Sequence, residues 1–225
     1  MFDAIAENLW AHNSTFSAMG FAVGHRMTVV KLKGGELFVH SPTPLDEAQT
    51  KALEDLGPIG HIVAPSRFHD LWLEPYLEKY QDIDTWAAPG FTDEHPKMHF
   101  KHVLGESAPD AWSDEMEQLI VSGMPKVNET VFFHKASRTL IICDLLFNLD
   151  LQDSFKNNLF LKLNGVYKKA APSRVLKLFT KDKAAVKRSV DQISEWDFER
   201  IILGHGNVVE GDNCPQVLKQ AFANW

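Results

Sequence analysis

Three short aliphatic segments of this chain each end on a side chain that can bind a metal or transfer a proton. Runs this apolar and this short predict buried strands of an α/β sheet. Binding residues of α/β folds lie in the loops at strand ends, so we expect the three ends to meet. The segments and the side chains that follow them are 201–203 with His205, 139–143 with Asp144, and 61–64 with His69 and Asp70.

Hairpins and helix-forming segments share the chain. Residues 27–33 alternate apolar and polar side chains and are followed by Gly34-Gly35 and the apolar run 36–40, which predicts a β-hairpin, and 130–134 with 139–143 predicts a second one. The mixture predicts an α/β domain with a mixed sheet or two packed sheets. Further strands are expected at 8–16, 59–64, 84–88, 118–121 and 201–203, helices at 45–56, 71–80, 173–179, 181–196 and 215–225, and irregular structure at 91–113.

Composition limits the classes of function. The net charge is −7, which argues against a general binder of nucleic acid or anionic membranes. The segment from Lys162 to Arg188 is basic and could steer an anion, although a solvated helix face is the favoured interpretation. Cys143 and Cys214 are the only cysteines, and their spacing supports neither a disulfide framework nor a zinc-thiolate site.

The sequence also predicts where the protein is located and what it binds. Residues 1–8 carry neither a basic region nor an apolar core, and no apolar run approaches the roughly 18 residues of a membrane span. We therefore expect a cytoplasmic protein that binds a small-molecule substrate or ligand, and neither nucleic acid nor membrane. The sequence does not determine the oligomeric state.

Each candidate site residue has a structural alternative. Glycines flank His205, so a ligand can approach closely, although a histidine in such a turn can also simply cap a strand end. A buried carboxylate at Asp144 needs a partner, unless the residue caps a helix that starts at Leu145. His69 and Asp70 can supply a ligand and its supporting carboxylate, unless Asp70 caps the following helix while His69 packs beneath it.

Other histidines are weaker candidates. His40 ends the strand 37–39 and can reach the same edge of the sheet. His134 also ends a strand, but the hairpin turn that follows places it at the opposite edge. The cluster of His95, His99 and His102 lies among prolines and lysines, which favours a surface loop.

The order of these elements resembles the metallo-β-lactamase superfamily. The Leu203-Gly204-His205-Gly206 loop is similar to the loop of the family's last histidine, and Ile142-Cys143-Asp144 is similar to its bridging aspartate. The hairpin 130–143 resembles the strands before that aspartate. The resemblance implies a four-layer αββα sandwich of two mixed sheets flanked by helices, formed by residues 1–225 as a single domain with a helical cap insertion at about 145–172.

The first ligand motif of that superfamily, HxHxDH, is only partly present. Ser66 and Phe68 stand where its first two histidines belong, Asp70 stands at its aspartate and Leu71 at its last histidine. The sequence 122–125 replaces the turn that carries the family's next histidine. The chain is therefore similar to a branch of the superfamily that forms a domain of unknown function, with a degenerate motif.

The resemblance implies a hydrolase with a reduced metal site. Asp144 and His205 would hold one divalent ion, with Asp70, His69 or His40 completing the site and with Asp70 and His69 as the catalytic residues. A carboxylate-rich set favours manganese or iron over zinc. The substrate would be an ester, lactone or amide attacked by water. The alternatives are a non-catalytic member that binds a ligand or partner without metal, and a metal-dependent oxidoreductase of the same fold.

Overall fold

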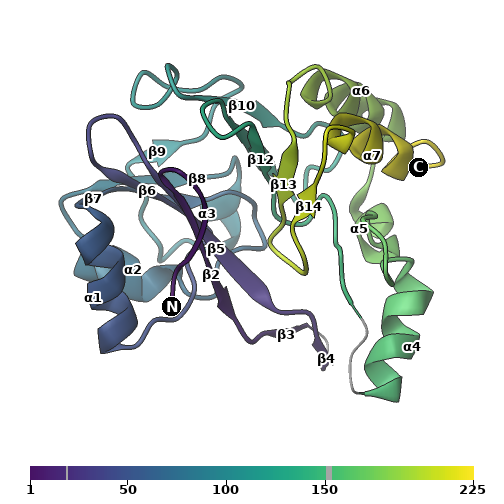
Figure 1. Ribbon diagram of the computed structural model, residues 1–225, viewed down its shortest axis with the longest axis horizontal. Coiled ribbons are helices and arrows are strands. Elements are labelled where there is room, and N and C mark those ends of the chain that lie inside the picture. The colour runs from purple at the N-terminus through teal and green to yellow at the C-terminus, as the bar shows by residue number, and fades with distance from the viewer. Residues whose placement is uncertain (19, 151–153) are drawn as a thin grey trace.

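Two β-sheets form the centre of the molecule, and a computed structural model describes residues 1–18, 20–150 and 154–225 (Figure 1). Within these residues the first sheet has seven strands in the order β1-β2-β5-β6-β7-β8-β9, and the second has five in the order β10-β11-β12-β13-β14. The first-sheet strands are β1 Asp3–Ala6, β2 Leu9–Ser14, β5 His25–Lys31, β6 Leu37–His40, β7 Ile59–Ala64, β8 Asp84–Ala87 and β9 His102–Val103. The others are β10 Met116–Ile120, β11 Thr130–His134, β12 Thr139–Ile141, β13 Arg200–Ile202, β14 Val209–Glu210, and the separate hairpin β3 Ser17–Ala18 with β4 Phe21–Ala22.

Helices cover the outer face of each sheet. The first sheet packs against α1 (Glu47–Leu56), α2 (Leu73–Lys79) and α3 (Phe91–Glu94), and the second against α6 (Lys183–Ile193) and α7 (Cys214–Ala221). Two further helices, α4 (Phe155–Asn164) and α5 (Arg174–Phe179), stand beside the sandwich (Figure 1). The result is the αββα sandwich of two mixed sheets that the sequence predicted, and this prediction is confirmed.

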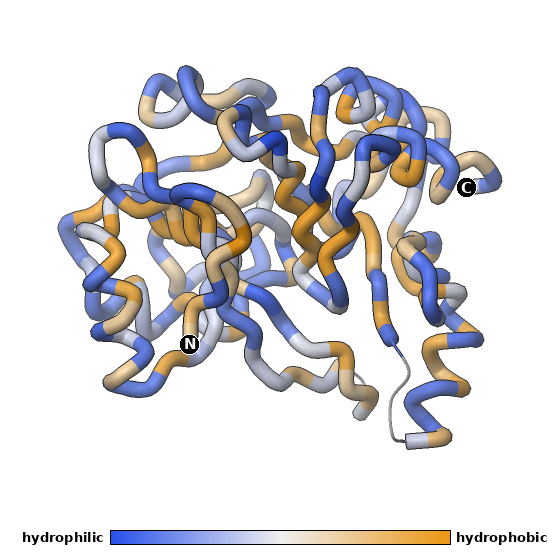
Figure 2. Tube along the Cα trace, in the orientation of Figure 1, coloured by the Kyte–Doolittle hydropathy of each residue, from blue (hydrophilic) through white to orange (hydrophobic). Residues whose placement is uncertain are grey.

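The space between the sheets is filled by large apolar side chains. Phe38 from β6 meets Trp112 with ring centres 5.0 Å apart and Phe132 from β11 with ring centres 5.2 Å apart. All three are buried, and the strands that carry this core are the apolar stretches at the centre of Figure 2. Burial of such side chains is the main term that holds the two sheets together.

The direction of the strands decides which residues share an edge. Strand β6 runs parallel to β7 in the first sheet and β12 runs parallel to β13 in the second, so in each sheet the loops that follow leave at one edge, and the contact of His69 with Asp144 shows that the two edges meet. Strand β5 runs antiparallel to β6, with Thr28 opposite His40. The start of β5 therefore lies beside the end of β6, and His25 reaches the edge that carries Ser41.

Most predicted elements are present. Both hairpins form, the strand 59–64 has the predicted bounds, and both cysteines are buried and free. The strands β3, β4, β9 and β14 are two residues long, too short to show a period in the sequence, and they were not predicted. The first strand, β1, was missed too.

Both predicted helix-cap alternatives are wrong. No helix begins at Leu145, because the chain bends there and α4 starts only at Phe155. Helix α2 starts at Leu73 without a side-chain cap, so Asp70 does not cap it through its carboxylate.

Residues 145–172 contain α4. Near the start of this range, isolated β-bridges join the chain to the loop after β13 and to the segment 167–171. Residues 151–153 of the predicted cap lie outside the described residues. The division into one domain with a cap insertion remains a prediction. Among the described residues no helix is long and apolar enough to cross a membrane.

Candidate metal centre

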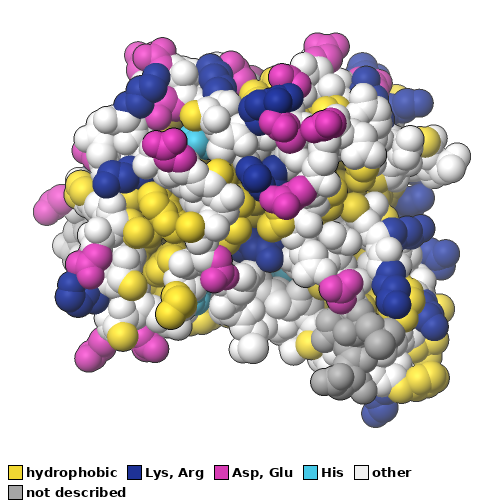
Figure 3. Space-filling view, in the orientation of Figure 1, with side chains coloured by type: hydrophobic (Ala, Val, Ile, Leu, Met, Phe, Trp, Pro, Cys, Tyr) yellow, Lys and Arg dark blue, Asp and Glu magenta, His cyan; other side chains and the backbone are white. Residues whose placement is uncertain are grey.

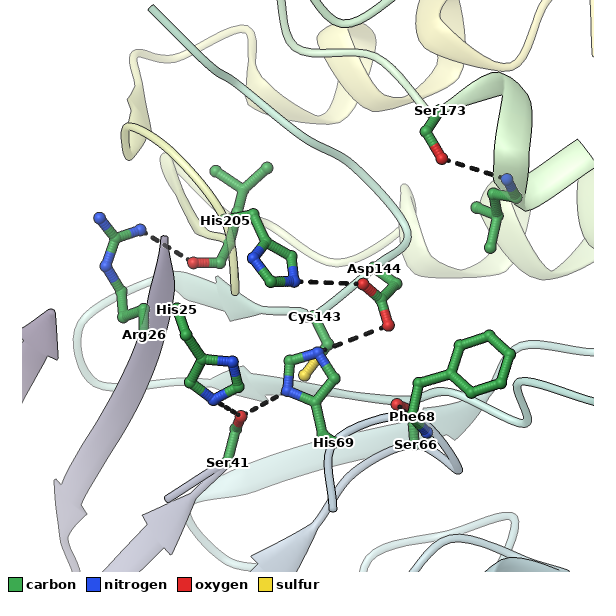
Figure 4. A network of polar contacts seen from close by, with 12 residues as sticks. His25, Arg26, Ser41, Ser66, Phe68, His69, Cys143, Asp144, Ser173 and His205 are labelled. Carbon is green, nitrogen blue, oxygen red and sulfur yellow. Dashed lines mark hydrogen bonds and ion pairs between the residues drawn. The ribbon is translucent and has the colours of Figure 1, made fainter. Parts of the chain in front are cut away.

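Three buried histidines converge where the two sheets meet at this edge. His25 comes from the start of β5, His69 from the loop after β7, and His205 from the loop after β13 (Figure 4). One ligand atom from each of the three lies within 4.8 Å of the others. Asp144, from the loop after β12, completes the group.

Asp144 contacts two of these histidines at once. Its Oδ1 lies 3.3 Å from Nε2 of His205 and its Oδ2 lies 3.4 Å from Nε2 of His69. Burial by itself would raise the pKa of Asp144, but the two imidazoles outweigh burial and hold the pKa below its usual value. The carboxylate is therefore ionised at neutral pH and available as a ligand.

Ser41 orients the other pair of imidazoles. Its Oγ lies 2.9 Å from Nε2 of His25 and 2.5 Å from Nδ1 of His69. The backbone of Ser41 has φ +54°, a left-handed conformation that is uncommon outside glycine and is concentrated at functional sites. Burial raises the pKa of the Cys143 thiol well above its usual value.

These bonds leave one nitrogen of each imidazole facing the centre. The Ser41 oxygen has two acceptor sites and lies against Nε2 of His25 and Nδ1 of His69, which leaves Nδ1 of His25 and Nε2 of His69 for the centre. Nδ1 of His205 donates to the carbonyl oxygen of Gly24 at 2.6 Å, which frees its Nε2 as well. An N–H held by an oxygen acceptor fixes the tautomer of a metal-binding histidine.

Packing around His205 restricts its position further. The ring of Phe147 stacks on the imidazole with ring centres 5.0 Å apart and planes 4° apart. Arg26 donates to the carbonyl oxygen of Leu203 at 2.8 Å and so ties the loop after β13 to the first sheet.

Steric limits explain why glycine occupies the positions on both sides of His205. A side chain at Gly204 would lie 3.1 Å from Cε1 of His69 and 3.2 Å from Cα of Cys143, so a larger residue would push the cluster apart. Gly206 has φ +89°, and a methyl group there would overlap the carbonyl of Asn148.

A second carboxyl group holds the loop of Asp144 from behind. Glu129 is fully buried, and its two oxygens accept the backbone N–H groups of Cys143 at 2.7 Å and Asp144 at 2.9 Å. Burial, followed by the charge of Asp144, raises the pKa of Glu129 to about 8, although backbone amides lower it. Glu129 therefore positions Asp144 and does not face the centre.

The donor set fits a divalent transition metal. Burial, followed by His69 and His205, lowers the pKa of His25 to about 2, so this imidazole is neutral as metal binding requires. A tetrahedral zinc ion spaces its ligand atoms roughly 3.3–3.5 Å apart, and each oxygen of Asp144 already lies at that distance from one imidazole nitrogen. The three nitrogens, up to 4.8 Å apart, would draw together by up to about 1.5 Å. Three imidazoles and one carboxylate favour zinc more than the carboxylate-rich set expected from the sequence.

The structure brings together some of the site residues that the sequence predicted and places the others outside the group. His69, Asp144 and His205 come together as expected. Asp70 instead points to His95, with its Oδ2 3.7 Å from Nδ1 of that histidine. His40 is buried beside the group, with Nε2 3.8 Å from the sulfur of Cys143, and lies outside the three-histidine group.

Sequence reasoning missed His25, Ser41 and Glu129. The predicted hairpin contained a signal for the first two, because the start of one strand lies beside the end of its antiparallel partner. Glu129 gave no local signal, since its role depends on the chain folding back over the loop of Asp144.

A family model described as a domain of unknown function, DUF4336, matches residues 6–155, two thirds of the chain. No curated protein matches the sequence.

Solved structures show the same fold at low identity. A metallo-β-lactamase from Pontibacter korlensis is 13% identical, with 100% of this chain and 99% of that chain covered and a TM-score of 0.68. For the metallo-β-lactamase DIM-1 the identity is 19%, the coverage 99% and 96%, and the TM-score 0.67. The metallo-β-lactamase FIM-1 from Pseudomonas aeruginosa, solved in a mono-zinc form, is 17% identical, with coverage of 99% and 94% and a TM-score of 0.65.

Replacing Ser41 by alanine tests the orienting role of its hydroxyl. We expect Ser41→Ala to lower zinc affinity about 10–100-fold, because both His25 and His69 lose the group that fixes their tautomers. Competition with a chelator of known zinc affinity measures the change. Ser194→Ala, whose hydroxyl only returns to its own helix at Val190, is the control and should retain the parent affinity. Equal affinity in the two variants would contradict the assignment.

Removing the carboxyl group of Glu129 tests the support of Asp144. We expect Glu129→Ala to lower the free energy of unfolding by about 2–4 kcal/mol, because two buried backbone N–H groups lose their acceptors. Urea denaturation of metal-free protein measures the effect. The exposed Glu106 serves as control, and Glu106→Ala should change stability by less than about 0.5 kcal/mol. A Glu129→Ala protein as stable as the parent would show that these bonds do not hold the loop.

Proposed function

The chain belongs to the DUF4336 family and has the metallo-β-lactamase fold, and we propose that it is a hydrolase that binds one divalent metal ion through His25, His69, His205 and Asp144. The observation that carries the proposal is the convergence of three imidazole nitrogens and one ionised carboxylate in a buried pocket. The substrate class proposed is an ester, lactone or amide.

A divalent ion held by these residues would polarise a carbonyl group and lower the pKa of water, which are the two requirements for hydrolysis near neutral pH. The protein supplies the remaining functions. Asp144 has two oxygens near the centre, so one can bind the ion while the other accepts a hydrogen bond from water and orients it. Phe16 and Phe147 lie against His205 and keep bulk solvent from the imidazole.

The proposed ligand set differs from the one expected from the sequence. His25 takes the place that Asp70 or His40 was expected to fill, and the set is richer in nitrogen than that expectation. We therefore propose zinc as the preferred ion, with manganese and iron as weaker alternatives. The proposed catalytic role of His69 becomes that of a ligand.

A member of the fold that binds a ligand without metal is the alternative. Asp144 already contacts two imidazoles, and these contacts can hold the cluster together without a metal. This alternative and the hydrolase predict opposite results for metal content.

Metal analysis of the purified protein separates the two. We expect about one equivalent of metal per chain in protein prepared without chelator, and a loss of affinity of at least about 100-fold in His25→Ala, because a direct ligand is worth more than an orienting group. His40→Ala is the matched control, since His40 is also buried at this edge but lies outside the three-histidine group.

Mass spectrometry of the bound metal and circular dichroism of the fold are measured together on each variant. Less than about 0.1 equivalent in the parent protein, with no rise in thermal stability on adding zinc or manganese, would exclude the metal site. Metal loss in a folded His40→Ala but not in His25→Ala would reassign the ligands.

A further inference from the structure

An apolar cavity opens directly onto the histidines. It has a volume of about 250 Å³, and His25, His69, Asp144 and His205 form one part of its wall. Apolar side chains make up most of the remainder, among them Phe16, Val23, Phe147, Leu149, Leu161 and Val175.

Two parts of the chain that are distant in sequence enclose this cavity. The hairpin of β3 and β4 contributes Ala18 and Val23, and α4 contributes Leu161. Val23 and Leu161 are buried in one apolar cluster. Phe21 stacks on Phe160 with ring centres 3.9 Å apart and planes 5° apart, which joins the hairpin to α4. The cavity is therefore a structured pocket and not a gap beneath a loop.

The described residues of the wall include no charged side chain away from the histidines and Asp144. Asn164 and Ser173 are its other polar side chains, and both are engaged: Asn164 donates to the carbonyl of Phe160, and Ser173 accepts from the backbone N–H of Leu176. No lysine or arginine is among the described residues that line the cavity. The basic side chains of this region lie outside it, on the surface that carries α4 and α5 (Figure 3).

We propose that this cavity binds an unbranched apolar chain of about eight non-hydrogen atoms whose carbonyl end lies at the three histidines. This proposal deepens the proposed hydrolase and rests on it, because it names the substrate as a medium-chain acyl ester or thioester. The length follows from the volume, since about 30 Å³ for each water-sized group gives roughly eight groups in about 250 Å³. Hydrolysis would add water across the acyl C–O or C–S bond and release the carboxylic acid and the alcohol or thiol.

The mouth of the cavity is apolar as well. Phe68 and Leu71 line the cavity and remain 41% and 54% exposed, so they present apolar surface to solvent. Both come from the loop that carries His69. These two side chains mark the side from which an acyl chain would enter. The apolar end of the chain would enter first, and the carbonyl group would follow and stop at the histidines.

Binding of neutral alcohols to metal-free protein tests the cavity without catalysis. Titration calorimetry with alcohols from ethanol to 1-decanol should show affinity rising about threefold to fourfold for each methylene and levelling off near eight carbons. Val175→Trp, which places an indole in the cavity, should weaken 1-octanol binding at least about tenfold. Leu178→Trp, on the same helix but 82% exposed, should leave it unchanged. Ala18→Trp fills the cavity from β3 if the first variant does not fold.

Ester hydrolysis by zinc-loaded protein gives the second readout. With 4-nitrophenyl acetate, butyrate and octanoate, we expect kcat/KM to rise with chain length and Val175→Trp to abolish this preference while zinc content stays unchanged. Alcohols that bind with this chain-length dependence, without any ester hydrolysis, would support the cavity and contradict the hydrolase. Hydrolysis without chain-length preference and without alcohol binding would overturn the cavity and leave the hydrolase standing.

Discussion

One carboxylate holds the functional edge of this protein together. Asp144 lies against His205 from its own sheet and His69 from the other, at 3.3 Å and 3.4 Å. The charge of a buried aspartate is costly unless it is paired, so the two sheets must bring both imidazoles to it. Glu129 fixes the backbone of Asp144, Ser41 fixes His69 and His25, and Gly24 fixes His205, so the geometry of the group is set by hydrogen bonds outside it.

The fold and three of the four residues of this group follow from sequence patterns. Apolar strands that end on His69, Asp144 and His205 are visible in the sequence because strand, loop and side chain are consecutive there. His25 was missed because it begins a strand instead of ending one, and the parallel-strand rule considers only the carboxyl ends. Ser41 and Glu129 act through hydrogen bonds between segments distant in sequence, which no local pattern encodes. Asp70 had the right neighbours in sequence, but the loop turns its carboxylate to His95.

The group and the cavity depend on one another. The apolar wall that would hold a chain includes Phe147 and Phe16, the same rings that pack on His205. A low-polarity wall strengthens the interaction between the carboxylate and any bound cation, because few competing dipoles surround it. The HxHxDH motif of the metallo-β-lactamase resemblance is largely replaced in this chain, yet His25 supplies a third imidazole from the first sheet, so the proposed site holds a single ion.

The X-ray absorption spectrum of zinc-loaded protein tests this account most directly, because it reports the atoms bound to the ion. We predict nitrogen and oxygen ligands at about 2.0–2.1 Å, with the outer-shell scattering of three imidazoles and no sulfur. In His25→Ala the imidazole scattering should fall to that of two rings. A sulfur ligand at about 2.3 Å would instead place Cys143 on the ion, and a spectrum without imidazole scattering would contradict the site altogether.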